Sequence, residues 1–158
     1  MKKYLKHIVL PALMIAALLF SSCLNQNQKN VYNDDNKIAS EGDSYTFISK
    51  VGKARESSFS FNYEGFTGKY TVLKITAEKE TVITLELISE VKRGEFKLCL
   101  VNSALEVKTI SEGSQDSSLP FTIPAGDNRI IMVGSKAKGT VSCSLSGDLS
   151  GLNVVPLD

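Results

Sequence analysis

The sequence predicts an all-β domain folded as an antiparallel β-sandwich of about eight or nine strands. From Tyr45 onward, short runs rich in Val, Ile, Thr, Phe and Tyr alternate with turn residues at strand-length intervals. No segment of this region has the 3.6-residue apolar period of an amphipathic helix. Short strands in such an array are typical of sandwiches and barrels.

Within the predicted strands, alternate residues are apolar, which indicates one face turned to a core. Phe59, Phe61 and Tyr63 share a face, as do Phe96, Leu98 and Leu100, and Ile83, Leu85 and Leu87 oppose Val82, Thr84 and Glu86. The predicted strands are residues 58–63, 69–77, 80–90, 95–102, 105–110, 121–134 and 140–147, and the predicted turns are 64–68, 92–94, 111–118 and 136–139.

Four regions follow from this pattern: residues 1–22, 23–44, 45–150 and 151–158. Residues 24–44 are polar and rich in Asn, so we expect a flexible tether that cannot bury enough apolar surface to fold. Residues 45–150 form the sandwich. Residues 151–158 are expected to be a C-terminal tail, with Val154 and Val155 able to pair with an edge strand.

The N-terminus reads MKKYLKHIVLPALMIAALLFSSC. Lysines are followed by an apolar run, 8–20, that is shorter than the roughly 20 residues that a membrane span needs, which is the layout of a signal-peptide helix. The small residues Ser21 and Ser22 before Cys23 resemble the lipobox of bacterial lipoproteins, with Phe20 where that family more often has Leu, Val or Ile. The resemblance implies cleavage before Cys23, a diacylated Cys23, and a lipid anchor on the extracytoplasmic side of the cell membrane. The alternative is an ordinary secretory signal with an incidental cysteine.

Composition excludes several functions for residues 23–158. The only histidine, His7, lies in the predicted signal, and tryptophan is absent. Nucleophiles activated by histidine and zinc sites containing histidine are therefore excluded, and we expect no catalytic residues, no metal and no cofactor. The 15 basic and 17 acidic residues that remain form no basic surface of the kind that binds nucleic acid.

A second resemblance lies in GEFKLCLVN (94–102), FTIPAGDNRIIMV (121–133) and KGTVSCSL (138–145). In this order the segments resemble the jelly-roll sandwiches of pre-peptidase C-terminal domains in secreted bacterial proteins. Asp127, Asn128 and Arg129 stand where that family favours aromatic residues. The resemblance implies a jelly-roll-like sandwich and a non-catalytic targeting or binding module.

Candidate ligand residues are few. Tyr63, Phe66 and Tyr70 cluster around a predicted glycine turn, where exposed aromatic rings could stack on sugars; the alternative is that they are core residues and Phe66 covers the turn. We interpret the charged side chains along 78–95 as a solvated face of the sheet. Lys108, Lys136 and Lys138 could form a small basic tip, or they could protect an edge strand from pairing.

Cys99 and Cys143 could form a disulfide in an oxidising compartment. The alternation, however, places Cys99 opposite Leu98 and Leu100, and Cys143 on the same face as Val141. We therefore expect the two thiols to point to opposite sides of their sheets, which favours free cysteines.

The sequence thus predicts a non-enzymatic, lipid-anchored β-sandwich that binds a cell-wall glycan or an envelope protein. One alternative is a structural or accessory subunit of a membrane-associated complex, which should expose a large apolar patch. A second alternative is a hydrolase that uses carboxylates alone, which should bring two of them together in a cleft.

Overall fold

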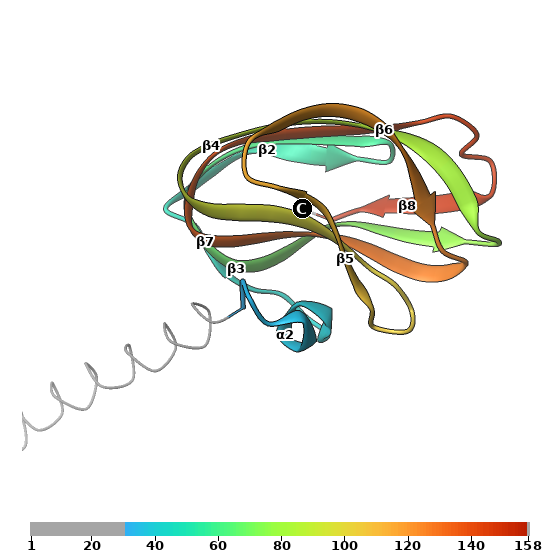
Figure 1. The fold of residues 1–158 in the computed structure, drawn as a ribbon, viewed down its shortest axis with the longest axis horizontal. Helices are drawn as coiled ribbons and strands as arrows, with labels where there is room; N and C mark the ends of the chain where they lie inside the picture. The colour runs from blue at the N-terminus through green and yellow to red at the C-terminus, as the bar shows by residue number, and fades with distance from the viewer. Residues whose placement is uncertain (1–30, 158) are drawn as a thin grey trace, which may run out of the picture.

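A computed structural model describes residues 31–157 and confirms the all-β antiparallel fold. Within the described residues, one short helix precedes eight strands (Figure 1). The predicted signal peptide and Cys23 lie outside the described residues. In chain order the elements are α2 (Asp35–Ala39), β1 (Ser44–Thr46), β2 (Ser49–Arg55), β3 (Ser58–Ala77), β4 (Thr81–Val101), β5 (Val107–Glu112), β6 (Gln115–Ile123), β7 (Gly126–Ser146) and β8 (Leu152–Pro156).

Three long strands, β3, β4 and β7, build both layers of the sandwich. They lie side by side in the order β3-β7-β4 and curl over together, so each contributes one half to each layer (Figure 1). Layer A contains β2, the first half of β3, the second half of β7, the first half of β4, and β6. Layer B contains β1 and β8, the second half of β3, the first half of β7, the second half of β4, and β5.

Three of the predicted turns are wrong: 64–68, 92–94 and 136–139 are irregularities inside continuous strands. The fourth, 111–118, is too long, because only residues 113 and 114 lie outside β5 and β6. The pairing register shifts at the irregularities, between Tyr63 and Gly68 on β3 and between Val91 and Glu95 on β4. Such β-bulges bend a strand without ending it. Gly94 supplies the positive φ of 73° that one bulge needs. Glycine and charged residues therefore mark the bend between the layers, and we call this edge of the sandwich the bend end.

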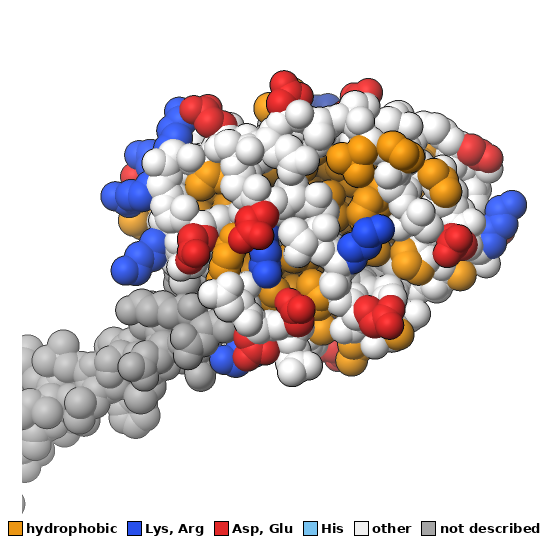
Figure 2. All heavy atoms as spheres, viewed as in Figure 1, with side chains coloured by type: hydrophobic (Ala, Val, Ile, Leu, Met, Phe, Trp, Pro, Cys, Tyr) orange, Lys and Arg blue, Asp and Glu red, His pale blue; other side chains and the backbone are white. Residues whose placement is uncertain are grey.

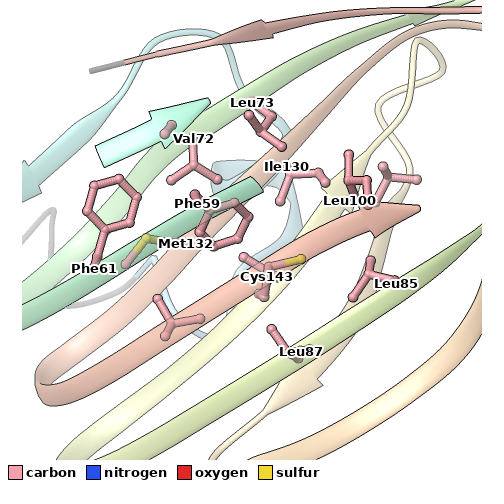
Figure 3. Close-up of a cluster of buried hydrophobic side chains, with 14 of the residues drawn as sticks. Phe59, Phe61, Val72, Leu73, Leu85, Leu87, Leu100, Ile130, Met132 and Cys143 are labelled. Carbon is pink, nitrogen blue, oxygen red and sulfur yellow. The ribbon is translucent and has the colours of Figure 1, made fainter. Parts of the chain in front are cut away.

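The main core fills the space between the layers, and Figure 3 shows part of it. The predicted inward faces are confirmed. Ile83, Leu85 and Leu87 are buried while Val82, on the opposite face, is largely exposed. Phe59, Phe61, Leu98 and Leu100 join the same cluster, as Met132 and Cys143 do from β7.

The expectation of a flexible tether over 24–44 is wrong for the described part, residues 31–44. Val31, Tyr32 and Ile38 are buried, and α2 packs on the outer face of layer B. The Asp34 carboxylate caps the helix by accepting a hydrogen bond from the Lys37 backbone N–H at 3.1 Å. A few apolar residues at suitable spacing are enough to dock this segment, although its average composition is polar.

Two cations hold the end of α2 against layer B. The Lys69 ammonium donates to the carbonyl oxygens of Ile38 and Ser40, and the Arg129 guanidinium donates to those of Ala39 and Ser40. Cations are favourable at a helix C-terminus. Burial, followed by the neighbouring Arg129 charge, lowers the pKa of Lys69.

The C-terminal segment also belongs to the sandwich. Residues 152–156 form β8, which pairs with β3 as expected for the tail. The Tyr70 hydroxyl donates to the Leu157 carbonyl oxygen at 3.2 Å and fastens the end of the chain. Within residues 31–157, no helix has the length and apolar character required to cross a membrane.

Candidate functional site

A polar groove of about 640 Å³ opens on the outer face of layer B, at the end away from the bend. The second half of β3 and the start of β7 form its floor. The segment after α2, the β4–β5 loop and the C-terminal segment form its walls. Its lining residues are Glu41, Gly42, Asp43, Thr71, Lys74, Thr76, Asn102, Ser103, Leu105, Asp127, Asn128, Arg129 and Leu157.

Two carboxylates of the groove are fixed by neighbouring hydroxyls. Asp43 Oδ1 accepts hydrogen bonds from the Thr71 backbone N–H at 3.0 Å and the Thr71 hydroxyl at 2.7 Å. Asp127 Oδ1 accepts from the Thr76 hydroxyl at 2.7 Å. In each carboxylate, Oδ2 has no donor among residues 31–157, so it can accept a hydrogen bond from a ligand.

Donors stand beside these acceptors. Lys74 and Arg129 are register partners on β3 and β7. The Arg129 guanidinium is held by the carbonyl oxygens at the end of α2, whereas the Lys74 side chain is exposed. The groove therefore interleaves fixed acceptors and donors and has no strong excess of either charge.

Asn128 shapes this part of the groove from below. Its side chain is 1% exposed, and Nδ2 donates to the carbonyl oxygens of Pro124 at 2.8 Å and Gly126 at 2.9 Å. These bonds fix the turn that enters β7. Asp127 and Arg129 consequently stand at set positions on either side of Asn128.

The β4–β5 loop presents an apolar side chain at the groove. Asn102 Oδ1 accepts from the backbone N–H groups of Ala104 and Glu106, which closes the loop tightly. Leu105 takes a positive φ of 62° and remains 57% exposed. A bulky residue in this region of φ is strained, and such strain concentrates at functional sites. Sequence reasoning missed this residue, for which the only local signal was the short Asn102–Ser103 corner.

The three aromatic candidates are not available to a ligand. Tyr63 and Phe66 are fully buried and Tyr70 is 3% exposed. The hypothesis that they stack on sugars is therefore replaced by its alternative, that they are core residues. The bulges that bend β3 turn this cluster inward between the layers.

The two cysteines are free, as the alternation predicted, and both are buried. Cys143 lies in the main core, and Cys99 lies on the outer face of layer B beneath the α2 segment. Burial raises the pKa of Cys99 to about 11 and that of Cys143 to about 12. Both thiols therefore stay protonated and poorly reactive at neutral pH.

Two observations on residues 31–157 concern metal binding and acid catalysis. Residues 31–157 contain no group of three or more His, Cys, Asp or Glu side chains placed to hold a metal ion. The ion-paired Lys138 lowers the pKa of Glu64, and hydrogen bonds from Ser150 lower that of Asp148. A glycosidase acid needs a shift in the opposite direction.

No family model matches the sequence, and no curated protein matches it. Among solved structures, the chain is similar to a family 35 carbohydrate binding module from an environmental isolate, with 12% identity, 72% of this chain and 82% of that chain covered, and a TM-score of 0.36. It is also similar to a CBM35 from Cellvibrio japonicus Abf62, with 13% identity, 72% and 81% covered, and a TM-score of 0.37. A mutant of a family 29 carbohydrate binding module gives 13% identity, 72% and 82% covered, and a TM-score of 0.38. At these values the similarity carries no inference about the ligand of this chain.

Proposed function

We propose that this protein is a non-catalytic binding module, held on the extracytoplasmic face of the cell membrane by a lipid on Cys23, and that the polar groove binds a cell-wall glycan. The observation that carries the proposal is the set of fixed hydrogen-bonding groups around Asp43, Asp127 and Arg129. Sugar hydroxyls both donate and accept, so they suit a groove in which acceptors and donors alternate. Because these side chains are already held in place, binding would cost little ordering entropy.

Leu105 adds a second element of this recognition. Pyranose rings have an apolar C–H face as well as polar edges. An exposed apolar side chain at the rim of a polar groove can cover that face, and the strained loop conformation holds Leu105 there.

The outer face of layer A does not favour an accessory subunit. Of the seven large apolar residues that are exposed within residues 31–157, Val51, Val82 and Ile88 lie on this face, on β2 and β4. The intervening strands β3 and β7 present Ser60 and Ser142 there, paired directly with each other. These apolar side chains are therefore separated by polar ones and do not form the contiguous patch of an assembly surface.

Binding is tested with the full-length processed protein and individual wall polysaccharides. Asp127→Ala removes an acceptor of the groove and is expected to weaken the affinity for the bound polysaccharide about 10- to 100-fold, the range for a hydrogen bond to a charged group. Isothermal titration measures the affinity. Asp116→Ala, an exposed carboxylate on β6 outside the groove, is the matched control and should leave it unchanged. Absence of saturable binding to every polysaccharide contradicts the glycan proposal and directs the search to a protein partner by crosslinking on intact cells.

Anchoring is tested separately. Cys23→Ala removes the acyl acceptor, so the variant is expected to remain unprocessed or to leave the membrane fraction. Metabolic labelling with palmitate, followed by detergent phase partitioning, measures both properties. Labelling that persists in Cys23→Ala contradicts the lipid anchor, and Cys99→Ala serves as a control that should keep the label.

A further inference from the structure

The bend end carries a cluster of basic side chains. Lys92 and Arg93 come from the bulge of β4, and Lys136 and Lys138 come from the bend of β7. Figure 2 shows Lys and Arg side chains gathered at the left edge, where β4 and β7 curl from one layer to the other in Figure 1. Two of the three lysines of the basic tip expected from sequence, Lys136 and Lys138, lie together at the bend end. Lys108 lies elsewhere, with its ammonium 4.6 Å from the centre of the Phe121 ring.

Two of these cations form ion pairs, and two do not within residues 31–157. Lys138 pairs with Glu64 at 2.8 Å, and Lys92 with Glu90 at 3.7 Å. The side chains of Arg93 and Lys136 form no ion pair or hydrogen bond within residues 31–157. Both line a depression of about 630 Å³, which Gly65, Gly94, Glu95, Ser135 and Ile48 complete.

Ile48 stands out from this basic surface. It is 77% exposed, more than any other large apolar residue of the described chain. Its side chain lies across Gly65, where an added Cβ would approach Ile48 Cγ1 to 2.5 Å, so the backbone of β3 supports it. Ile48 shares its depression with Arg93 and Lys136, and with one acidic residue, Glu95. An exposed apolar side chain beside cations is typical of surfaces that enter the headgroup region of an anionic membrane.

The start of the described chain lies near the same end. The Tyr32 hydroxyl donates to Glu112 at 2.9 Å, and its ring lies under the Lys97 ammonium at 5.0 Å, shortly after the β4 bulge. Residues 24–30 separate Cys23 from Val31, a segment that spans at most about 30 Å. A lipid on Cys23 would therefore keep the bend end close to the bilayer.

We propose that the bend end docks on an anionic lipid bilayer, with Ile48 in the headgroup region and Arg93 and Lys136 facing lipid phosphates. This rests on the proposed function, because the lipid on Cys23 brings the domain to the surface. Docking fixes the orientation of the domain. The groove lies at the opposite end of layer B and consequently points away from the membrane, toward the wall.

The absence of tryptophan in this chain allows a direct test. Ile48→Trp places a single indole fluorophore at the proposed contact in the full-length processed protein, reconstituted on vesicles whose lipids carry brominated acyl chains. With phosphatidylglycerol in the vesicles, the emission of this indole should shift to the blue and be quenched. With phosphatidylcholine alone, or at high salt, both effects should fade, because the attraction is electrostatic.

Matched variants separate docking from other effects. Val82→Trp reports from an exposed site, 61% accessible, at the far end of layer A, and should not be quenched. Arg93→Gln with Lys136→Gln, in the Ile48→Trp protein, should lower the equilibrium constant for docking roughly fivefold for each cation removed. Lys53→Gln with Lys79→Gln, which remove two exposed lysines elsewhere, should leave it unchanged. Circular dichroism checks that each variant is folded.

Two readouts distinguish docking from anchoring. Flotation of the Ile48→Trp protein with the vesicles reports the lipid on Cys23. Quenching of its indole at a saturating vesicle concentration reports docking, whether or not the lipid is attached. Flotation without quenching overturns the docking proposal while the anchor stands. Equal quenching in the Ile48→Trp and Val82→Trp proteins also overturns it, because the domain would then have no preferred orientation.

Discussion

Replacement of Ile38 by alanine is expected to lower the free energy of unfolding by about 3 kcal/mol, the middle of the range for a buried Ile reduced to Ala. Ile38 is fully buried between α2 and layer B, next to Cys99. Loss of its side chain loosens the helix and exposes Cys99 to alkylating reagents, whereas Cys143 in the main core stays protected. Denaturant unfolding measures the first effect, and mass spectrometry after alkylation locates the second.

Lys37 of the same helix, which is half-buried and packs outside the apolar cluster, provides the control. Lys37→Ala is expected to change stability by no more than about 0.5 kcal/mol, as is usual for surface positions, and to leave both thiols protected. If Ile38→Ala has no more effect than Lys37→Ala, residues 31–40 are not docked and the expectation of a flexible tether is right. The experiment therefore decides how closely a lipid on Cys23 can hold the sandwich to a membrane.

The composition of the segment 31–44 explains why its docking was not predicted. Sequence reasoning weighs average polarity, and here polar residues dominate. Docking depends instead on Val31, Tyr32 and Ile38, together with a surface of layer B that can receive them. That surface includes Cys99 and Ile131, and it forms only once strands distant in sequence have paired. No local sequence pattern can therefore predict the docking of residues 31–44.

The strand faces could be predicted because alternation is a local property, but strand ends could not. Glycine and charged residues favour a reversal of the chain and a β-bulge alike. At 64–68 and 92–94 the pairing of the strands decides for a β-bulge and against a reversal of the chain, because β3 and β4 each continue along β7 past the irregularity. The sequence pattern thus yields the sandwich and its core faces, while the folding of three long strands through both layers emerges only from their pairing.

The groove could not be predicted for a related reason. Asp43 lies more than 80 residues before Asp127 and Arg129 in the sequence. No local pattern groups it with them, because their shared role depends on strand register and on the docked end of α2. The sequence indicated the aromatic residues instead, since aromatic side chains near glycine resemble sugar-binding surfaces. Aromatic rings also fill cores, and local sequence does not separate the two uses.

Phe66→Ala gives the clearest contrast between those two uses. The Phe66 ring is fully buried, stacks on Phe47 at 4.5 Å and 8°, and contacts Tyr63 and Phe96 in edge and tilted arrangements at 6.0 and 6.5 Å. It also covers Gly134, where an added Cβ would approach Phe66 Cδ1 to 2.4 Å. We expect its loss to lower the free energy of unfolding by about 4 kcal/mol, measured by denaturant unfolding. Polysaccharide affinity per folded molecule should not change, because the ring cannot reach the groove.

Phe66→Leu, which refills most of the volume, should recover most of the stability. A Phe66→Ala protein that unfolds like the parent but no longer binds polysaccharide would return this ring to the surface and reinstate the aromatic site.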